Sequence, residues 1–171
     1  MVFLIDAVGK MPKMTIACLL ALALFLPAGR AVAAEDTVKM IAAPASLTKA
    51  GPFIGFMKKN QITVDVVAPA DAAGVKKSNV IIIEGGMDDA ASKALISEVA
   101  GAAEAASLAK TGAKKMFLKE NLWQPGQKIL VFAGGNAEDA AAARVENRET
   151  WMKYFKQWFD LDESPEGLKG Y

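Results

Sequence analysis

The chain has 171 residues, with 20 Lys and Arg against 19 Asp and Glu, no histidine and one cysteine. This length fits one or at most two domains. A formal net charge of +1 argues against a nucleic-acid partner, because binding to phosphates requires a local excess of basic residues. The absence of histidine removes the commonest general base near neutral pH and the commonest metal ligand.

Residues 1–34 are predicted to be an N-terminal extension and a secretory signal peptide. Lysines precede an apolar run over residues 14–26, and small residues follow that run up to Ala34, as they do before a signal-peptidase cleavage site. The run is shorter than the roughly 20 residues that a membrane-spanning helix needs. We therefore expect an extracytoplasmic protein (periplasmic, cell-surface or secreted) with no membrane span after cleavage. Cleavage would also remove Cys18, so the mature protein would have no disulfide.

Residues 35–171 are predicted to form a single α/β domain in which strands and helices alternate. The apolar runs Val80–Ile83 and Ile129–Phe132 are typical of strands buried on both faces of a parallel sheet. The fold class predicted is therefore one layered α/β domain, with a mostly parallel sheet of four to five strands flanked by helices. In chain order we expect a strand at 37–43, a mixed and partly helical segment at 46–60, strands at 62–68 and 80–83, a helix at 88–110, strands at 115–120 and 129–132, and a helix at 137–159.

A βα unit occurs twice in this domain, at residues 80–94 and 129–143. Aligning Val80 with Ile129 superposes the two apolar runs, the two Gly-Gly pairs that follow them and two helices that begin with acidic residues. In this alignment Asp89 lies over Glu138. The two copies either arose by duplication or are two ordinary βα units that share these residues because any βα unit needs a buried strand, a tight turn and a helix start. In parallel strands both Gly-Gly pairs would lie at the carboxyl edge of the sheet, where α/β folds commonly bind ligands.

The residues around the Gly-Gly pairs are candidates for ligand binding. No nucleotide-binding glycine motif is present, and carboxylates at the helix starts favour the helix dipole and repel anions, so no cofactor is predicted. The simplest interpretation is that the polar residues cap the helices, and the alternative is a small ligand or a hard cation. The candidate ligand-binding residues are Gly85, Gly86, Asp88, Asp89, Gly134, Gly135 and Asn136, and the candidate metal ligands are Glu84, Asp89, Glu138 and Asp139.

Ser46-Leu47-Thr48-Lys49 resembles the S-x-x-K motif of penicillin-binding proteins and D-alanyl-D-alanine carboxypeptidases, and residues 110–112 resemble their K-T-G. The resemblance implies an envelope serine acyl-enzyme in which Ser46 attacks and Lys49 activates it. The interval between the motifs is too short for that family's helical subdomain. The S-x-N triplet is absent from residues 35–171, and K-T-G ends a predicted helix where the family has a strand. The acyl-enzyme is therefore the alternative, and a non-catalytic protein is the main prediction.

A second resemblance covers residues 64–144. Residues 78–86 (SNVIIIEGG) and 121–135 (NLWQPGQKILVFAGG) resemble the hydrophobic-run-Gly-Gly and N-x-W/F…K-x-L-V-x-A-G elements of archaeal S-layer and S-layer-like cell-surface domains. The resemblance implies an exported, non-catalytic cell-envelope or surface module, able to form oligomers, that contacts an envelope protein or a glycan. After Gly-Gly this chain has Met-Asp-Asp where the family has Pro and a nearby Asn. As a single module, it is expected to be a stand-alone relative and not a lattice protein.

Aromatic residues recur at helical spacing over residues 151–159 and form one stripe. The main interpretation is that this stripe packs on the sheet. The alternatives are a partner interface, in which Trp and Tyr are favoured anchors, or a stacking platform for sugars. A further tryptophan lies in a Trp-Gln-Pro-Gly turn, where burial is harder. The candidates for interface or stacking contacts are Trp123, Trp151 and Trp158.

Overall fold

The computed structural model describes residues 37–161, and the predicted signal peptide with its cleavage site lies outside them. All described residues belong to one compact unit. The strands are β1 (Thr37–Ala42), β2 (Thr63–Val67), β3 (Val80–Gly86), β4 (Lys114–Glu120) and β5 (Lys128–Gly134). The helices are α1 (Pro44–Lys49), α2 (Gly51–Lys59), the 3-10 helix η1 (Pro69–Val75), α3 (Ala90–Ala100), α4 (Ala102–Leu108), α5 (Ala137–Glu146) and α6 (Arg148–Phe159).

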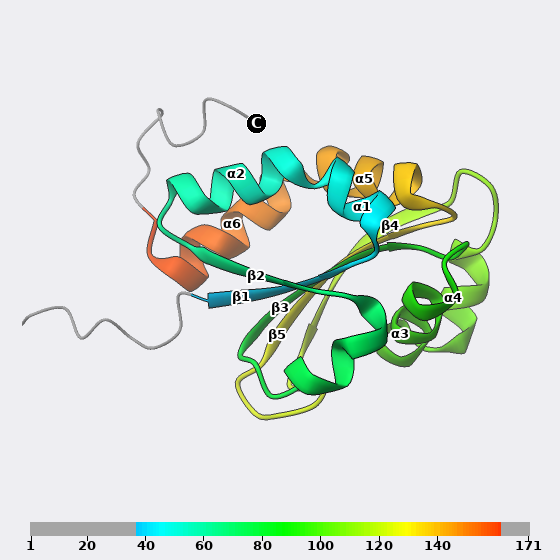
Figure 1. Cartoon of the computed structure of the whole chain (residues 1–171), viewed down its shortest axis with the longest axis horizontal. Helices are drawn as coiled ribbons and strands as arrows, with labels where there is room; N and C mark the ends of the chain where they lie inside the picture. The colour runs from blue at the N-terminus through cyan, green and yellow to red at the C-terminus, as the bar shows by residue number, and fades with distance from the viewer. Residues whose placement is uncertain (1–36, 162–171) are drawn as a thin grey trace, which may run out of the picture. The chain divides into compact units, whose positions relative to one another are not determined.

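The five strands form one sheet in the order β2-β1-β3-β5-β4 (Figure 1). The first four strands in this order are parallel, and β4 is antiparallel to β5. In the register of the central strands, Ile82 lies beside Met40 on one side and beside Leu130 on the other. The predicted fold class, a mostly parallel sheet flanked by helices, is confirmed.

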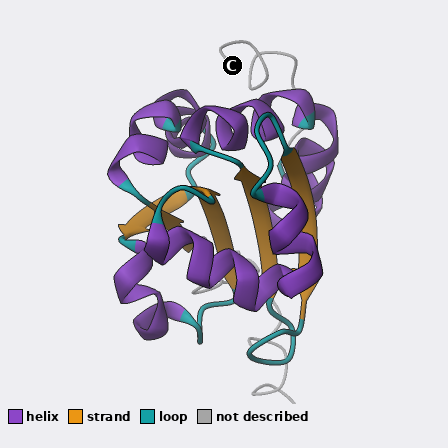
Figure 2. Ribbon diagram, turned by 90° about the vertical axis from the view of Figure 1, so that its right-hand side faces the viewer, coloured by secondary structure: helices purple, strands orange, loops and turns teal. Residues whose placement is uncertain are grey.

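Helices cover both faces of the sheet, so that the domain has three layers (Figures 1 and 2). Helices α1, α2, α5 and α6 lie on one face, and η1, α3 and α4 lie on the other. Successive residues of β3 point to opposite faces: Ile82 packs in the core that contains Trp151, whereas Ile83 packs in the core that contains Ile96. This double burial explains why β3 and β5 have apolar runs without alternation.

Both helices that the sequence predicts as continuous are interrupted. The segment predicted at 88–110 divides into α3 and α4 at Gly101, whose φ of 91° lies in a region that glycine adopts without strain. The segment predicted at 137–159 divides into α5 and α6 at Asn147, whose side-chain Nδ2 donates to the carbonyl of Ala143 (2.8 Å). Each predicted long helix is therefore two shorter helices that lie on the same face of the sheet.

The aromatic stripe of α6 packs on the sheet, as the main interpretation predicts. Trp151 and Phe155 are fully buried, and the Trp151 ring lies edge-on to Phe53 of α2, with 4.9 Å between ring centroids. Trp151 is therefore no surface contact, and its place among the interface candidates was wrong. Trp158 is half-buried and stacks on Tyr154. Within residues 37–161 no helix has the length and apolarity to cross a bilayer.

Candidate functional site

The two Gly-Gly turns lie side by side at the carboxyl edge of the parallel strands. Gly86 of β3 pairs with Gly134 of β5, so the predicted meeting of the turns at one edge is confirmed. The backbones touch, since the N–H of Met87 donates to the carbonyl oxygen of Gly134 (2.9 Å). A Cβ added to Gly86 would lie 2.5 Å from the carbonyl carbon of Asn136, and one added to Gly134 would lie 2.6 Å from the backbone nitrogen of Ala140. Glycine is required here because the chain itself fills the space.

Two of the candidate ligand-binding residues cap helices. An Asp89 oxygen accepts from the N–H of Ser92 (2.7 Å), and the Asn136 oxygen accepts from the N–H of Asp139 (2.9 Å). The hydrogen bonds from Ser92 lower the pKa of Asp89 below its ordinary value. Asp89 is therefore the structural equivalent of Asn136. The sequence alignment placed it over Glu138, which was wrong because the second turn is shorter than the first.

The four candidate metal ligands do not converge. Glu84 forms an ion pair with Arg144, Glu138 forms one with Lys49, and Asp89 caps α3. In the part of the chain that the structure describes, no group of three or more acidic, histidine or cysteine side chains is placed to hold a metal ion. Glu84 and Glu138 thus serve ion pairing and Asp89 serves capping. The fourth candidate, Asp139, has a buried Oδ2 with no hydrogen-bond partner among residues 37–161.

The Glu84–Arg144 ion pair is buried between β3, α1 and α5. The side chains are 0% and 3% exposed, with Arg144 Nε 2.8 Å from Glu84 Oε2. Arg144 Nη2 donates to the carbonyl of Lys49 (2.8 Å), and the guanidinium lies 5.4 Å from the ring centroid of Phe53. Burial raises the pKa of Glu84, while the charge of Arg144 opposes that rise. Sequence reasoning missed Arg144; the only signal was an arginine among the buried alanines of α5.

The serine–lysine pair of the acyl-enzyme alternative is not assembled. Ser46 is 1% exposed, and its Oγ has no hydrogen-bond partner among residues 37–161. The Lys49 ammonium points instead to Glu138, with which it forms a surface ion pair. Nucleophilic catalysis needs a hydroxyl that the substrate can reach and a base in hydrogen-bond contact with it. The K-T-G residues, 110–112, lie in the turn between α4 and β4 and not on a strand.

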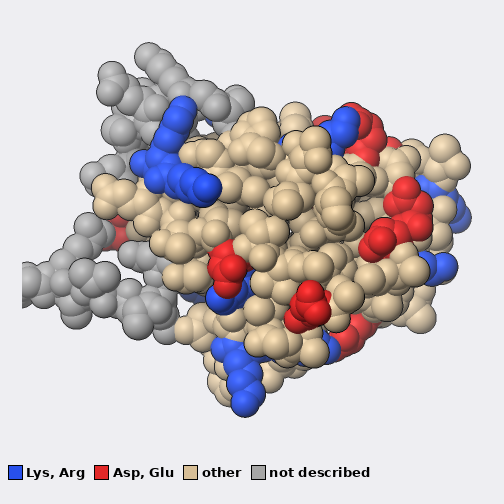
Figure 3. Space-filling model, in the orientation of Figure 1, with Lys and Arg blue, Asp and Glu red and all other residues tan. Residues whose placement is uncertain are grey.

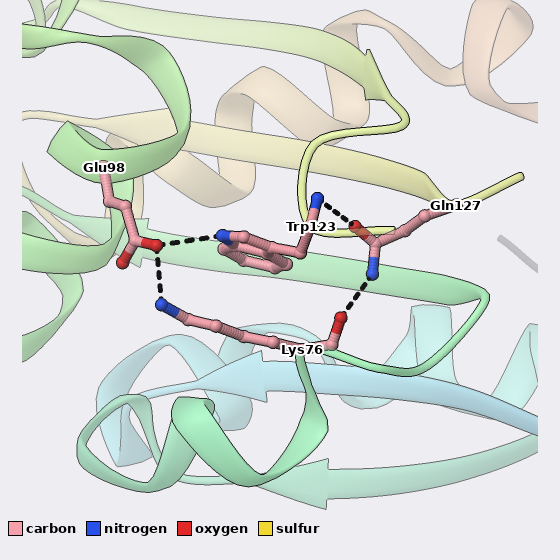
Figure 4. Close-up of polar contacts among 4 residues, drawn as sticks. All are labelled: Lys76, Glu98, Trp123 and Gln127. Carbon is pink, nitrogen blue, oxygen red and sulfur yellow. Dashed lines mark hydrogen bonds and ion pairs between the residues drawn. The ribbon is translucent and has the colours of Figure 1, made fainter. Parts of the chain in front are cut away.

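At the opposite, amino edge of the sheet, Trp123 joins a polar cluster (Figure 4). Its indole Nε1 donates to Glu98 Oε1 of α3 (2.9 Å), and the Lys76 ammonium, which follows η1, is 2.6 Å from the same oxygen. Lys76 Nζ also lies 4.9 Å from the centroid of the Trp123 ring, in cation–π range. Hydrogen bonds from Lys76 and Trp123 lower the pKa of Glu98. Three segments that are distant in sequence are thereby tied together.

Gln127 fixes the loop that carries Trp123. Its side chain is fully buried, and Nε2 donates to the carbonyls of Lys76 (2.7 Å) and Ser78 (2.8 Å). Its Oε1 accepts from the backbone N–H of Trp123 (3.1 Å). One amide thus makes two hydrogen bonds from the β4–β5 loop to the segment before β3 and a third within the loop. Sequence reasoning identified Trp123 but missed Lys76, Glu98 and Gln127.

A surface hollow of about 330 Å³ lies beside this cluster, between η1 and α3. We call it the η1–α3 hollow. Short side chains form most of its wall, and Lys76 and Glu98 contribute the charged groups. It exists because alanine leaves room where a longer side chain would fill the space between the two helices. The lining residues are Pro69, Ala70, Ala72, Ala73, Lys76, Ala91, Ala94, Leu95 and Glu98.

Comparisons with known proteins give no match: no family model, no curated protein and no solved structure matches the chain. The fold defines a three-layer α/β domain in which the two Gly-Gly turns fill the carboxyl edge of the sheet and a surface hollow lies between η1 and α3.

Proposed function

We propose that the protein is an exported, non-catalytic module of the cell envelope or cell surface that works by contact with another protein. The observation that carries this proposal is the η1–α3 hollow, whose lining includes Lys76 and Glu98, together with Trp123, which donates to Glu98 beside it; we call these three residues the rim. Protein interfaces concentrate their binding energy where an anchor side chain enters a pocket that excludes water. A hollow walled by alanine methyl groups, with an ion pair at its margin, suits an apolar side chain of a partner.

The rim favours a protein over a glycan. Sugars stack on an open aromatic face, but one face of Trp123 lies under Lys76 and the residue packs against the core that contains Ile96. The two charged groups of the rim also form an ion pair with each other, Lys76 with Glu98. A glycan would need free hydrogen-bonding groups, whereas an apolar anchor needs only the wall of the hollow.

The site is also held in shape before any partner arrives. Gln127 fixes the Trp123 loop through three hydrogen bonds, and Gln124 Nε2 adds a bond to the carbonyl of Lys77 (2.6 Å). A preorganised surface loses less conformational entropy on binding, so more of the contact energy appears as affinity. The S-layer-like resemblance of residues 64–144 and the predicted signal peptide support a surface location for such a module.

Export is tested by producing the full chain in bacterial cells and measuring the mass of the protein in the extracytoplasmic fraction. We expect a chain that begins at Glu35 or within a few residues of it. A cytosolic protein that retains its N-terminal segment would contradict the envelope location.

Contact through the hollow is tested by photo-crosslinking in the producing cells. A photoreactive phenylalanine analogue replaces Ala73, at the hollow, and in the control replaces Ala106, which is exposed on α4 and lies outside it. We expect a protein adduct of one defined mass from position 73, lost when Ala94→Trp fills the hollow. Equal adducts from both positions would contradict a specific site. Co-sedimentation with purified peptidoglycan that depends on Ala94 would instead identify a glycan as the ligand.

A further inference from the structure

The two outer strands of the sheet differ in how they are protected. β4 carries Lys114, Lys115, Lys119 and Glu120 among its seven residues. Charged residues, and lysine above all, are a common means by which proteins prevent an edge strand from pairing with another chain. Lys114 and Lys115 are held along that edge by ion pairs with α5 and α4. The β4 edge is therefore blocked.

β2 lacks this protection. Its sequence, TVDVV, contains neither proline nor glycine, and its one charged residue, Asp65, forms an ion pair with Lys39 of β1. β1 pairs with one side of the strand, and no other strand of residues 37–161 pairs with the opposite side. The N–H and C=O groups of that side are directed away from the sheet, where they form a template for a further strand.

β2 carries an exposed apolar side chain. Val66 is 39% exposed, and only two other large apolar residues in the part of the chain described, Leu122 in a loop and Val145 on α5, are exposed to this degree. In Figure 3, which has the orientation of Figure 1, charged groups lie at the margin of the face shown and also along the path of β2. The free backbone groups of β2 thus lie beside an exposed valine, and the charge on the strand is Asp65, which is paired with Lys39.

We propose that β2 is the self-association edge of the protein, at which a second copy of the chain adds its own β2 in antiparallel orientation. Two identical edges related by a twofold axis are self-complementary, so the partner needs no feature that this chain lacks. The product is one continuous ten-stranded sheet, twice the five strands of one copy. Because the β4 edge is blocked, addition stops at two copies. The inference uses no contact within the η1–α3 hollow, so it stands independently of the proposed function.

Charge selects the register of the pair. If Asp65 lay opposite Asp65 of the second copy, two carboxylates would meet directly, which destabilises an antiparallel pair. If Val66 lies opposite Val66, each Asp65 faces a Val67 on the same side of the sheet, and the two apolar side chains meet at the axis. The second register is the one we assign. A strand of five residues makes a small interface, so micromolar affinity is expected.

The first test is sedimentation equilibrium of the full chain at concentrations from about 1 to 300 μM, a range set around the micromolar affinity expected for a small interface. We expect a monomer–dimer equilibrium with no larger species. Val66→Lys should raise the dissociation constant at least tenfold while the circular dichroism spectrum stays unchanged. The matched control is Val145→Lys, which replaces an equally large and more exposed valine on α5 (58%) and should leave the dimer intact.

The second test fixes the register. In a Cys18→Ser background, which removes the one native cysteine, Val66→Cys should give a disulfide-linked dimer under mild oxidation, because directly opposed Cβ atoms lie within disulfide range. Thr63→Cys, at the far end of the strand, should not crosslink. A folded chain that is monomeric throughout the range overturns the proposal. So does a dimer that Val66→Lys leaves unchanged, growth beyond two copies, or equal crosslinking at position 63.

Discussion

Replacing Arg144 by methionine tests the role assigned to the buried ion pair. The substitution keeps the length of an aliphatic side chain and removes the guanidinium that faces Glu84 Oε2 at 2.8 Å. Glu84 is fully buried, and its other oxygen, Oε1, already has no hydrogen-bond partner among residues 37–161. Without Arg144 the carboxylate would be a buried charge with no counterion, and the carbonyl of Lys49 would lose a donor.

The loss of unfolding free energy in Arg144→Met depends on whether Glu84 stays ionised or binds a proton. Removing one partner of a buried pair typically costs about 3–5 kcal/mol of unfolding free energy. The carboxyl group can avoid this cost by binding a proton. Burial already raises the pKa of Glu84 above 4.5 in the native protein, and the pKa will rise further when the Arg144 charge is gone. A carboxyl with a raised pKa in the folded state costs no stability below its unfolded pKa and an increasing amount as pH rises toward the folded value.

Urea denaturation of Arg144→Met, monitored by tryptophan fluorescence at several pH values between 4.5 and 8, measures how its free energy of unfolding depends on pH. We expect the free energy of unfolding to fall below that of the native protein by the smallest amount near pH 4.5. This deficit should grow by up to about 1.4 kcal/mol per pH unit until the folded pKa is passed. The double substitution Glu84→Leu with Arg144→Met removes both charges, and replacing a buried pair by apolar residues is often neutral. It should recover all but about 1 kcal/mol, the value of the lost hydrogen bond to the Lys49 carbonyl.

A deficit for Arg144→Met that is the same at every pH would refute the reasoning, because loss of packing alone has no proton dependence. A double variant as unstable as the single one would also contradict it, since the cost would then not come from the stranded carboxylate. Scanning-calorimetry traces at pH 5 and pH 8 provide a second measurement of the same difference.

Three further predictions concern single positions. Gly86→Ala should destabilise the fold by about 1–3 kcal/mol, because the new methyl group meets the neighbouring turn. The control Gly55→Ala, in α2, adds a methyl group with no atom within 4 Å and should stabilise the fold by about 0.5–1 kcal/mol. Equal shifts of melting temperature for the two variants would contradict the packing of the turns. Asp89→Asn should keep the helix cap, and its melting temperature should fall less between pH 5 and pH 2 than that of the native protein. The pKa of Asp89 is below 3.8 in the folded state, so its contribution is lost as pH falls through that folded value. Gln127→Ala should lower the melting temperature and shift tryptophan emission to the red as the loop is freed, and the exposed Gln157→Ala should change neither.

The sequence predicts the fold well where burial is the dominant cause. The runs at 80–83 and 129–132 are apolar at every position, and only a strand covered on both faces requires that. The helix breaks at Gly101 and Asn147 escape prediction because a helical hydrophobic pattern continues across them, and the two helices on either side of each break pack on the same face of the sheet. Periodicity therefore locates the faces of a helix better than its ends.

The candidate site is predicted less well, because its groups come from separate segments. Trp123 can be identified from its turn alone, but Lys76 and Glu98 reach it only when η1 and α3 are brought to the β4–β5 loop by the sheet. Likewise, the sequence suggests Glu84 as a metal ligand, but in the fold its carboxylate is paired with Arg144, which is distant in sequence. A sequence motif identifies which side chain is present, whereas the residues that this side chain contacts depend on the order of the strands in the sheet.

These placements reverse the usual reading of an open α/β sheet. Ligands in such folds are expected beyond the carboxyl ends of the strands. Here that edge is filled by the two Gly-Gly turns, which contact each other through Met87 and Gly134, and by the buried Glu84–Arg144 pair behind them. The open surfaces are the hollow between η1 and α3 and the unpaired edge of β2. Both surfaces are open to another molecule, and this accessibility is the physical reason for proposing a function in contact and assembly.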